Sequence, residues 1–219
     1  QEIHLGTPLS IKSAFRFPLQ HAHARKEVLI GAALLLVPVV GWLLNMGHRI
    51  EMVHRMHHGL PAWPAWNNWG RLFKHGVLTC LGMIEYHAPA SICFAIAHVY
   101  EVTWLYAVGA VLWIIATMMV PGYMTHFCVH FDVSEIFNPF KATRRVFEGG
   151  LAYLHAWTIA LTAMCLSFTG LLLGGIGFLP TSVWFWQVAG FSFATVFTQT
   201  FHLHQSEVGA APGPLAANT

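Results

Sequence analysis

Five long apolar runs constrain the fold of this chain more than any other feature. They cover residues 28–46, 76–100, 102–124, 151–179 and 183–203. Each is close to the length of about 20 residues at which an α-helix crosses the hydrocarbon layer of a membrane. Because a segment in lipid must satisfy its own backbone hydrogen bonds, helices are favoured over isolated strands. The runs predict an all-α integral membrane protein, with a single polytopic domain over residues 1–204.

The composition agrees with a membrane protein and argues against a nucleic-acid partner. Of the 219 residues, 56% are hydrophobic and 9% are charged, which is too few charges for the surface of a soluble domain. The formal net charge is +2, and the basic residues form short clusters beside the apolar runs. The four cysteines (Cys80, Cys93, Cys128 and Cys165) have no paired spacing, so neither a zinc site nor a disulfide framework is expected.

The distribution of Lys and Arg predicts the topology. Basic residues precede the first run and lie between runs one and two and between runs three and four. Cytoplasmic loops are enriched in Lys and Arg, and all these clusters share one side only if the first run enters the membrane and returns. Pro38 and Gly41 interrupt that run. We therefore expect four transmembrane helices plus one re-entrant or shallow hairpin, with five spans as the alternative. The expected setting is a bacterial inner membrane, with both termini on the cytoplasmic side.

Two segments outside the runs resemble interfacial amphipathic helices. Residues 9–26 and 133–147 both mix apolar and basic side chains, and each precedes an apolar run, a faint repeat that suggests two related halves. Runs two and three meet at Glu101, so we expect an antiparallel hairpin there. Residues 205–219 are predicted to form an extended C-terminal tail with little to bury, which would rest on neighbouring chains.

Histidines supply one set of candidate metal ligands. His54, His57 and His58 have the HxxHH spacing of membrane di-iron desaturases and hydroxylases, and His126 and His130 lie four residues apart. Side chains three or four residues apart lie on one helix face and can share a metal ion. A membrane di-iron oxidoreductase is therefore one hypothesis, although a second HxxHH sequence is absent.

A second set of histidines lies within the apolar runs. A b-type haem needs an axial histidine on each of two helices, whereas a chlorophyll needs only one ligand. His87 and His98 share one run, so His155 is the available partner for either of them. These residues support the hypothesis of an electron-transfer or pigment subunit that binds haem b or (bacterio)chlorophyll.

The polar block at residues 48–75 has a simpler interpretation as a belt at the membrane surface. Its His, Arg and Lys residues would contact lipid headgroups, and Trp63, Trp66 and Trp69 would be the aromatic anchors. Glu85 is an ionisable residue inside an apolar run, and such residues are costly in lipid and often functional. Alternatively, the membrane helix begins just after Glu85, which then pairs with a basic residue at the interface.

Two segments rich in Pro, Gly and aromatic residues carry a family resemblance. The first comprises "LLLVPVVGWLLNMGHRIEMV" and "LPAWPAWNNWGRLFKHG", and the second comprises "MMVPGYMTHF" and "DVSEIFNPFKATRRVFEGGLAYL". Together they resemble an uncharacterised bacterial and archaeal membrane family, the domain of unknown function number 4013, over most of residues 10–165. The resemblance implies a multi-span helical membrane protein and brings no established catalytic residues.

These observations favour a non-catalytic accessory subunit that packs beside a larger membrane complex, such as a photosynthetic or respiratory assembly. The expected partners are membrane lipids and other membrane subunits, and this interpretation requires no cofactor. Its support is the aromatic content of the last run and the C-terminal tail. A haem or chlorophyll subunit, a di-iron oxidoreductase and a small transporter are the alternatives.

Overall fold

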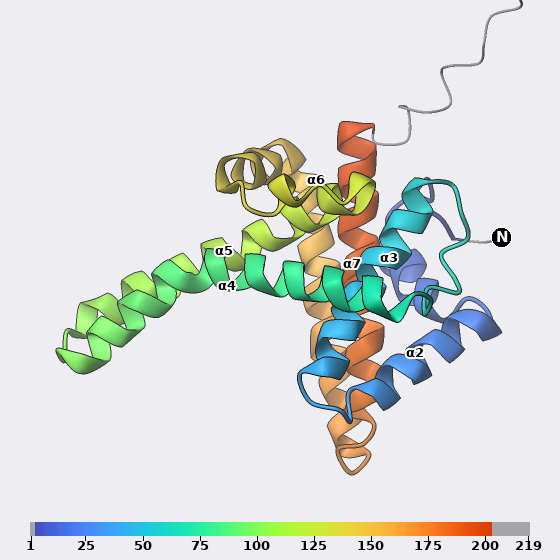
Figure 1. Cartoon of the computed structure of the whole chain (residues 1–219), viewed down its shortest axis with the longest axis horizontal. Helices are drawn as coiled ribbons and strands as arrows, with labels where there is room; N and C mark the ends of the chain where they lie inside the picture. The colour runs from blue at the N-terminus through green and yellow to red at the C-terminus, as the bar shows by residue number, and fades with distance from the viewer. Residues whose placement is uncertain (1–2, 203–219) are drawn as a thin grey trace, which may run out of the picture.

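The computed structural model describes residues 3–202, which form helices joined by short loops without any strand (Figure 1). The elements are α1 (Ile11–Arg16), η1 (Phe17–Leu19), α2 (Ala22–Leu34), α3 (Val40–His57), α4 (Trp69–Val99), α5 (Thr103–His130), η2 (Val133–Glu135), α6 (Pro139–Ser167), η3 (Phe168–Leu172) and α7 (Phe178–Phe201). The predicted all-helical class is confirmed. The predicted tail at 205–219 lies outside the described residues.

In the described part of the chain, three helical segments are long and apolar enough to cross a membrane: α4, α5, and the stretch of α6 and η3 over Pro139–Leu172. The sequence predicted a fourth span at 183–203, which corresponds to α7. That helix carries buried polar side chains, among them Gln187, Ser192 and Thr195, which lower its apolar character.

The first apolar run is broken, as Pro38 and Gly41 predicted. Helix α2 ends before Pro38, and α3 begins just after it and turns back along α2. A Cβ atom on Gly41 would lie 1.7 Å from the carbonyl oxygen of Leu34, so only glycine permits this close return. The Nδ2 of Asn45 donates to the carbonyls of Gly31 at 3.1 Å and Gly41 at 2.8 Å, which ties the two helices together.

Helices α3 and α4 cross closely through a reciprocal pair of glycines. A Cβ atom on Gly47 would lie 1.8 Å from the carbonyl oxygen of Leu72, and one on Gly76 would lie 1.9 Å from that of Leu43. Small residues at such a crossing let two helix backbones approach each other. This contact fixes the position of α3 and therefore of its polar face.

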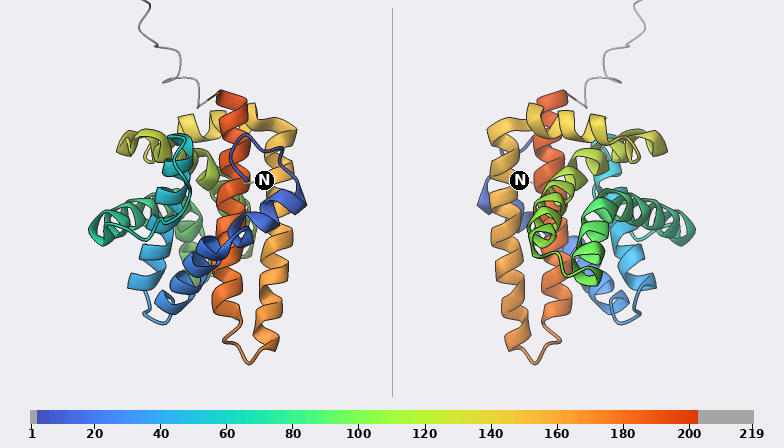
Figure 2. Two further views of the ribbon diagram at one scale, coloured as in Figure 1. Left: turned by 90° about the vertical axis from the view of Figure 1, so that its right-hand side faces the viewer. Right: turned by 90° about the vertical axis from the view of Figure 1, so that its left-hand side faces the viewer.

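The expected antiparallel hairpin is formed by α4 and α5. They are joined at residues 100–102, where Glu101 adopts a left-handed conformation with φ of 56°. The hairpin extends to the side of the α6–α7 pair, as two perpendicular views show (Figures 1 and 2). The two hairpins point in different directions, so this arrangement does not itself show four parallel spans.

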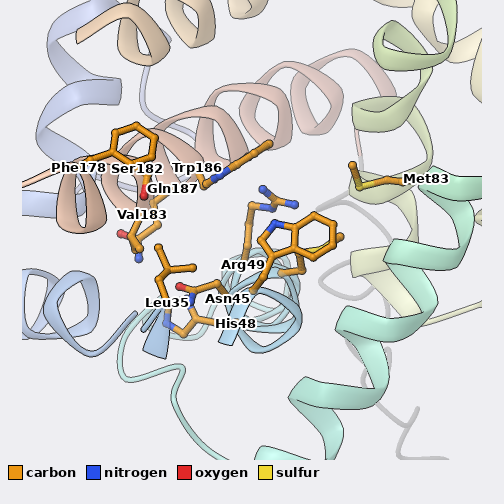
Figure 3. Close-up of a pocket in the computed structure, with 12 residues that line it drawn as sticks. Leu35, Asn45, His48, Arg49, Met83, Phe178, Ser182, Val183, Trp186 and Gln187 are labelled. Atoms are coloured by element: carbon orange, nitrogen blue, oxygen red, sulfur yellow. The ribbon is translucent and has the colours of Figure 1, made fainter. Parts of the chain in front are cut away.

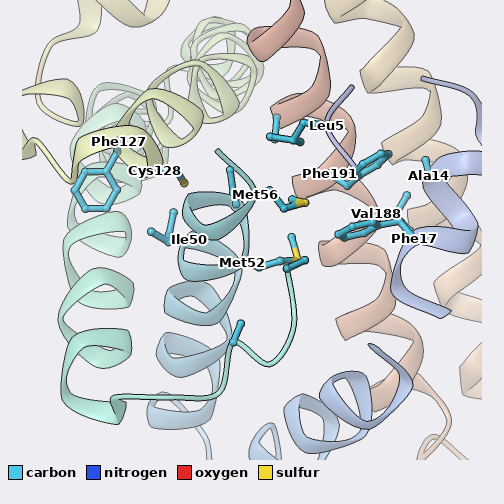
Figure 4. Packing of buried hydrophobic residues seen from close by; sticks show 14 of the residues in the cluster. Leu5, Ala14, Phe17, Ile50, Met52, Met56, Phe127, Cys128, Val188 and Phe191 are labelled. Atoms are coloured by element: carbon cyan, nitrogen blue, oxygen red, sulfur yellow. The ribbon is translucent and has the colours of Figure 1, made fainter. Parts of the chain in front are cut away.

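Helix α6 bends at Gly150, where φ is 49° and ψ is −134°. The bend separates a basic first part from an apolar second part, close to the boundary that the sequence predicted between residues 133–147 and the run at 151–179. At the other end of the chain, α1 packs on α7, and the Nε1 of Trp184 donates to the carbonyl of Phe15 at 3.2 Å. Figure 4 shows the core between these elements, including Leu5, Phe17, Ile50, Met52, Met56, Phe127, Val188 and Phe191.

Candidate functional site

The buried carboxylate of Glu27 joins α2, α3 and the loop before α4. The Oε2 atom of Glu27, on α2, accepts hydrogen bonds from His48 Nε2 at 2.8 Å and from the backbone N–H groups of Ala65 at 3.0 Å and Trp66 at 3.3 Å. The indole Nε1 of Trp66 donates to the carbonyl of Glu27 at 3.1 Å. The side chains of Glu27 and His48 are 5% and 1% exposed. Both buried groups are therefore well partnered, and the loop before α4 is fixed to α2.

The tryptophans of that loop pack against the His48 ring. Its centroid lies 4.0 Å from that of Trp66 and 5.9 Å from that of Trp63, with nearly parallel planes. Trp63 is 4% exposed, so it belongs to the core and does not anchor the chain at a lipid surface as the sequence suggested. Trp69 is half exposed and stacks on Trp66, which leaves it the best placed of the three to reach lipid.

Burial and hydrogen bonding have opposite effects on the pKa values of Glu27 and His48. Burial alone would raise the pKa of Glu27, but the hydrogen bond from His48 and those from Ala65 and Trp66 bring it below its ordinary value. Burial lowers the pKa of His48, although Glu27 partly opposes this effect.

Arg49, the next residue on α3, is buried in a different way. It is 8% exposed, and in residues 3–202 no carboxylate oxygen lies within 4.0 Å of its guanidinium group. Its Nη2 lies 3.9 Å from the sulfur of Met124, and its Cζ lies 4.8 Å from the ring centroid of Trp186. Burial lowers its pKa to about 10, so the group remains positively charged at neutral pH.

A cavity of about 240 Å³ opens beside this guanidinium group, between α3 and α7. Figure 3 shows Arg49 reaching from α3 toward Trp186 of α7. Gln187, which also lines the cavity, is 2% exposed, and within the described chain neither atom of its amide has a hydrogen-bond partner. Buried polar atoms without partners are uncommon in native proteins.

A second cavity of about 320 Å³ adjoins the first, since Arg49, Met83 and Trp186 line both. Its wall is mainly apolar and includes Ile50, Val53, Val120, Leu161, Met164 and Phe193. A Cβ atom on Gly190 of α7 would lie 3.0 Å from both Cγ and Cδ of Arg49. The glycine thus leaves room for the arginine stem between the cavities.

Within residues 3–202 the structure places His54 and His58 side by side, with ring centroids 4.2 Å apart, but it does not gather the five predicted di-iron ligands into one metal site. Nδ1 of His54 bonds the carbonyl of Cys128 at 2.7 Å, and Nδ1 of His58 bonds that of His54 at 2.9 Å. His57 is buried beside α7, with Nδ1 3.4 Å from the hydroxyl of Thr198. The other two candidates, His126 and His130, lie on α5, where His126 packs against Phe197 and Phe201 and His130 is exposed. Among the residues that the structure describes, no group of three or more His, Cys, Asp or Glu is placed to hold a metal ion.

The candidate haem and chlorophyll ligands are dispersed as well. Both ring nitrogens of His87 are engaged, with Nδ1 2.8 Å from the carbonyl of Met83 and Nε2 3.1 Å from the hydroxyl of Thr117. His98 and His155 are exposed on α4 and α6.

Glu85 is exposed on α4 and does not join the buried polar groups. The expected belt at 48–75 is also altered, because His48, Arg49 and His75 are buried. The reason is that α3 is covered on several sides by α4, α5 and α7, so most of its polar side chains face protein and not a membrane surface.

The residues that define the site were not singled out from the sequence as a group. Glu27 stands at the start of an apolar run, and Gln187 interrupts another. Gln187 has apolar neighbours on both sides, a pattern that could have marked it for burial, whereas Glu27 follows Arg25 and Lys26 and carries no such signal. The pairing of Glu27 with His48 and the lack of a partner for Arg49 depend on the packing of distant segments.

Over residues 3–202, the fold and the site define an all-helical protein with three candidate membrane-spanning segments and a buried cation beside an apolar cavity. The chain belongs to the family described as protein of unknown function DUF4013, whose model matches residues 30–180. This confirms the resemblance noted in the sequence. Neither the search of curated proteins nor the search of solved structures found a match.

Proposed function

We propose that this protein is a non-catalytic accessory subunit of the bacterial inner membrane, which packs against other membrane subunits through the α4–α5 hairpin. One observation carries the proposal: in the outer part of that hairpin, between Ser91 and Ile115, only Ala97 and Gly109 are buried. Large exposed side chains there include Ile92, Ile96, Val99, Tyr100, Trp104, Val111, Trp113 and Ile114. An apolar surface this extensive marks a site of contact with lipid or with another protein.

The charge pattern of the hairpin supports insertion into a membrane. Residues 88–115 contain a single Asp, Glu, Lys or Arg, which is Glu101 at the turn. Tyr100 and Trp104 flank this turn and are 72% and 66% exposed. Tyr and Trp are enriched where a membrane protein meets the headgroup region.

The packing of the hairpin supports a contact with a protein in addition to lipid. The α6–α7 pair does not cover its outer half, which projects away from that pair (Figure 1). The two helices approach through small residues, since a Cβ atom on Gly109 would lie 2.7 Å from the ring of Phe94. The hairpin is therefore internally packed, and its outward face is available to helices of another subunit.

We propose in addition that the α2–α3 hairpin is re-entrant and that the basic clusters face the cytoplasm. The break at Pro38 and the polar face of α3 support this topology. Four parallel spans further require that the α4–α5 hairpin align with the α6–α7 pair. Single cysteines at Arg16 and Arg55, in a cysteine-free background, should both react with a membrane-impermeant reagent from the cytoplasmic side. Labelling from opposite sides would contradict the re-entrant hairpin.

Photocrosslinking in native membranes tests the subunit contact. A photoreactive amino acid replaces Trp104 or Ile114 on the hairpin, with Leu172, exposed between α6 and α7, as the matched control. We expect the same protein adduct, with one defined mass, from both hairpin positions and not from the control position. Adducts only with lipid, or only with a second copy of this chain, would overturn the accessory-subunit proposal.

A further inference from the structure

The cleft between α3 and α7 contains two buried polar groups that no residue of the described chain neutralises or pairs. Arg49 carries a positive charge with only the Met124 sulfur and the Trp186 ring as recorded contacts. Gln187 presents an amide with both atoms unpartnered in the part of the chain that the structure describes. Burial of a charge is unfavourable unless a counter-charge or hydrogen bonds compensate it. The two residues line the same cavity, so one ligand can reach both.

The chemistry of these groups selects an anion. A guanidinium group binds a carboxylate or a phosphate with two parallel hydrogen bonds, and it has no acceptor of its own. The Nε2 of Gln187 can add a third donor to the same oxygen atoms. A metal cation would be repelled by the arginine, and a neutral ligand would leave its charge uncompensated.

The shape of the cleft selects an amphipathic ligand. The cavity beside Arg49 and Gln187 adjoins the second, largely apolar cavity, since Arg49, Met83 and Trp186 line both. Their volumes, about 240 and 320 Å³, together fall within the range of roughly 300–1,000 Å³ of small-molecule sites. A small inorganic anion would fill only the polar end and leave the apolar end empty.

We propose that this cleft binds an amphipathic anion, whose carboxylate or phosphate head contacts Arg49 and Gln187 and whose acyl chain occupies the adjoining apolar cavity. Gly190 leaves space for the arginine stem, and Trp186 packs against the guanidinium group, so the cation is held in position before the ligand arrives. Trp113 of the outer hairpin lines the apolar end of the site, but the head-group end is formed by α3 and α7, so the site does not depend on the proposed subunit contact.

Binding of matched amphiphiles to the full chain in a neutral detergent tests the proposal. The probes are dodecanoate, dodecyl phosphate and dodecanol, each brominated at the end of the chain and applied at a pH at which both acids are ionised. Bromine in the apolar cavity quenches nearby tryptophans, and Trp113, Trp157 and Trp186 line that cavity. We expect both anions to quench tryptophan fluorescence at concentrations at least about tenfold lower than dodecanol does. One hydrogen bond to a charged group is sufficient to give this ratio of affinities.

The relative affinities of the two anions identify the source of the head group. Tighter binding of dodecanoate indicates a fatty-acid-type carboxylate, and tighter binding of dodecyl phosphate indicates a lipid phosphate. Either result supports the site. Equal binding of dodecanol and the anions, or no saturable quenching by any probe, would overturn it without bearing on the crosslinking result at the hairpin.

Substitutions then place the head group at Arg49. We expect Arg49→Met to weaken binding of the anions by about tenfold or more and to leave dodecanol nearly unaffected. Arg49→Lys keeps the charge but loses the planar pair of donors, so a loss of several-fold is expected; it also serves if the methionine variant does not fold. Arg144→Met is the control, because Arg144 is exposed on α6. Unchanged affinity in both Arg49 variants, or an equal loss in the control, would contradict the assignment.

Discussion

His48 and Arg49 are consecutive residues of α3, are both buried and both line the smaller cavity, yet their interaction partners differ. His48 donates to Glu27 and stacks between two tryptophans, and the carboxylate of Glu27 receives further hydrogen bonds from the loop before α4. Arg49 lines the cavities, and within residues 3–202 its guanidinium group has the sulfur of Met124 and the ring of Trp186 as partners and no carboxylate. Adjacent positions on a helix point about 100° apart, so one faces α2 and the loop while the other faces α7.

This difference between His48 and Arg49 indicates that a buried polar group can either stabilise the fold or remain available to a ligand. A buried pair with all its hydrogen bonds made within the chain holds segments together, and loss of one member leaves the other uncompensated. A buried cation without a partner adds nothing comparable to stability, so its replacement by an apolar side chain of similar size is expected to cost little. Stability measurements on matched variants therefore distinguish the two regions.

The largest effect is expected for Glu27→Ala. The substitution removes the acceptor for His48 and for the backbone N–H groups of Ala65 and Trp66, and it leaves a cavity. Each buried donor left without a partner costs about 1–3 kcal/mol, so we expect a total loss of about 3 kcal/mol or more. Reversible unfolding in detergent, followed by circular dichroism, measures the change.

Glu148→Ala is the matched control, because Glu148 pairs with the exposed Arg144 within one helix turn. It should unfold like the unmodified chain, since exposed ion pairs contribute little. A similar loss of stability in both variants would mean that the Glu27 contacts do not hold α2 to α3.

The second prediction concerns pH. The pKa values of His48 and Glu27 are both lower in the folded chain than their ordinary values of 6.5 and 4.5. The unfolded chain therefore takes up protons at a higher pH than the folded chain does. The free energy of unfolding should be highest above pH 6.5, decrease below pH 6.5, where His48 is protonated in the unfolded chain, and decrease further below pH 4.5, where Glu27 is. Each such proton contributes at most about 1.4 kcal/mol per pH unit.

Unfolding at a series of pH values from neutral to acidic tests this dependence. In His48→Gln the position no longer titrates, so the decrease in stability just below pH 6.5 should be shallower than in the unmodified chain. An equally steep decrease would assign the effect to other histidines, such as His54, whose pKa is also lowered by burial.

The contrast between the two neighbours also explains what the sequence could predict. The helix break at Pro38, the hairpin at Glu101 and the change of character in α6 near Gly150 each depend on local signals within a few residues, and all three were predicted. The direction of the α4–α5 hairpin relative to α6–α7 depends on contacts between segments far apart in the chain, and no local pattern predicts it. The same holds for the burial of Trp63, which the sequence placed at a lipid surface.

The candidate site was less predictable than the fold for a related reason. Histidines at three- and four-residue spacing suggested a metal site, but His54 and His58 instead bond backbone carbonyls and His126 packs against aromatic rings. Spacing shows which side chains share a helix face, but not what lies opposite that face. The role of Arg49 depends on what α7 presents to it, namely Gly190 and Trp186.

The third prediction is that Arg49→Met changes the free energy of unfolding by no more than about 1 kcal/mol, or increases it, despite the burial of Arg49. Arg145→Met is the comparison, because Arg145 is also largely buried but bonds Glu135. Its loss should destabilise the chain more, since Glu135 then keeps only Lys141 as a partner among the described residues. A larger cost at Arg49 than at Arg145 would reveal an internal partner for Arg49.

The smallest effect is expected at Gln187. Replacement of this amide by methionine removes two unpartnered polar atoms and keeps a side chain of similar length, so we expect a change within about 1 kcal/mol, in the stabilising direction. Asn45→Leu is the matched amide, and it should destabilise the chain because Asn45 donates to the carbonyls of Gly31 and Gly41 at the α2–α3 turn.

The two amides thus repeat the contrast between His48 and Arg49 with uncharged groups, measured by the same unfolding experiment. Clear destabilisation by Gln187→Met would show that its amide is already paired within the protein. If instead Gln187→Met unfolds normally but binds dodecanoate less tightly, the amide contributes to the ligand and not to the fold. That combination is expected of a polar group kept in an apolar cleft for a ligand's head.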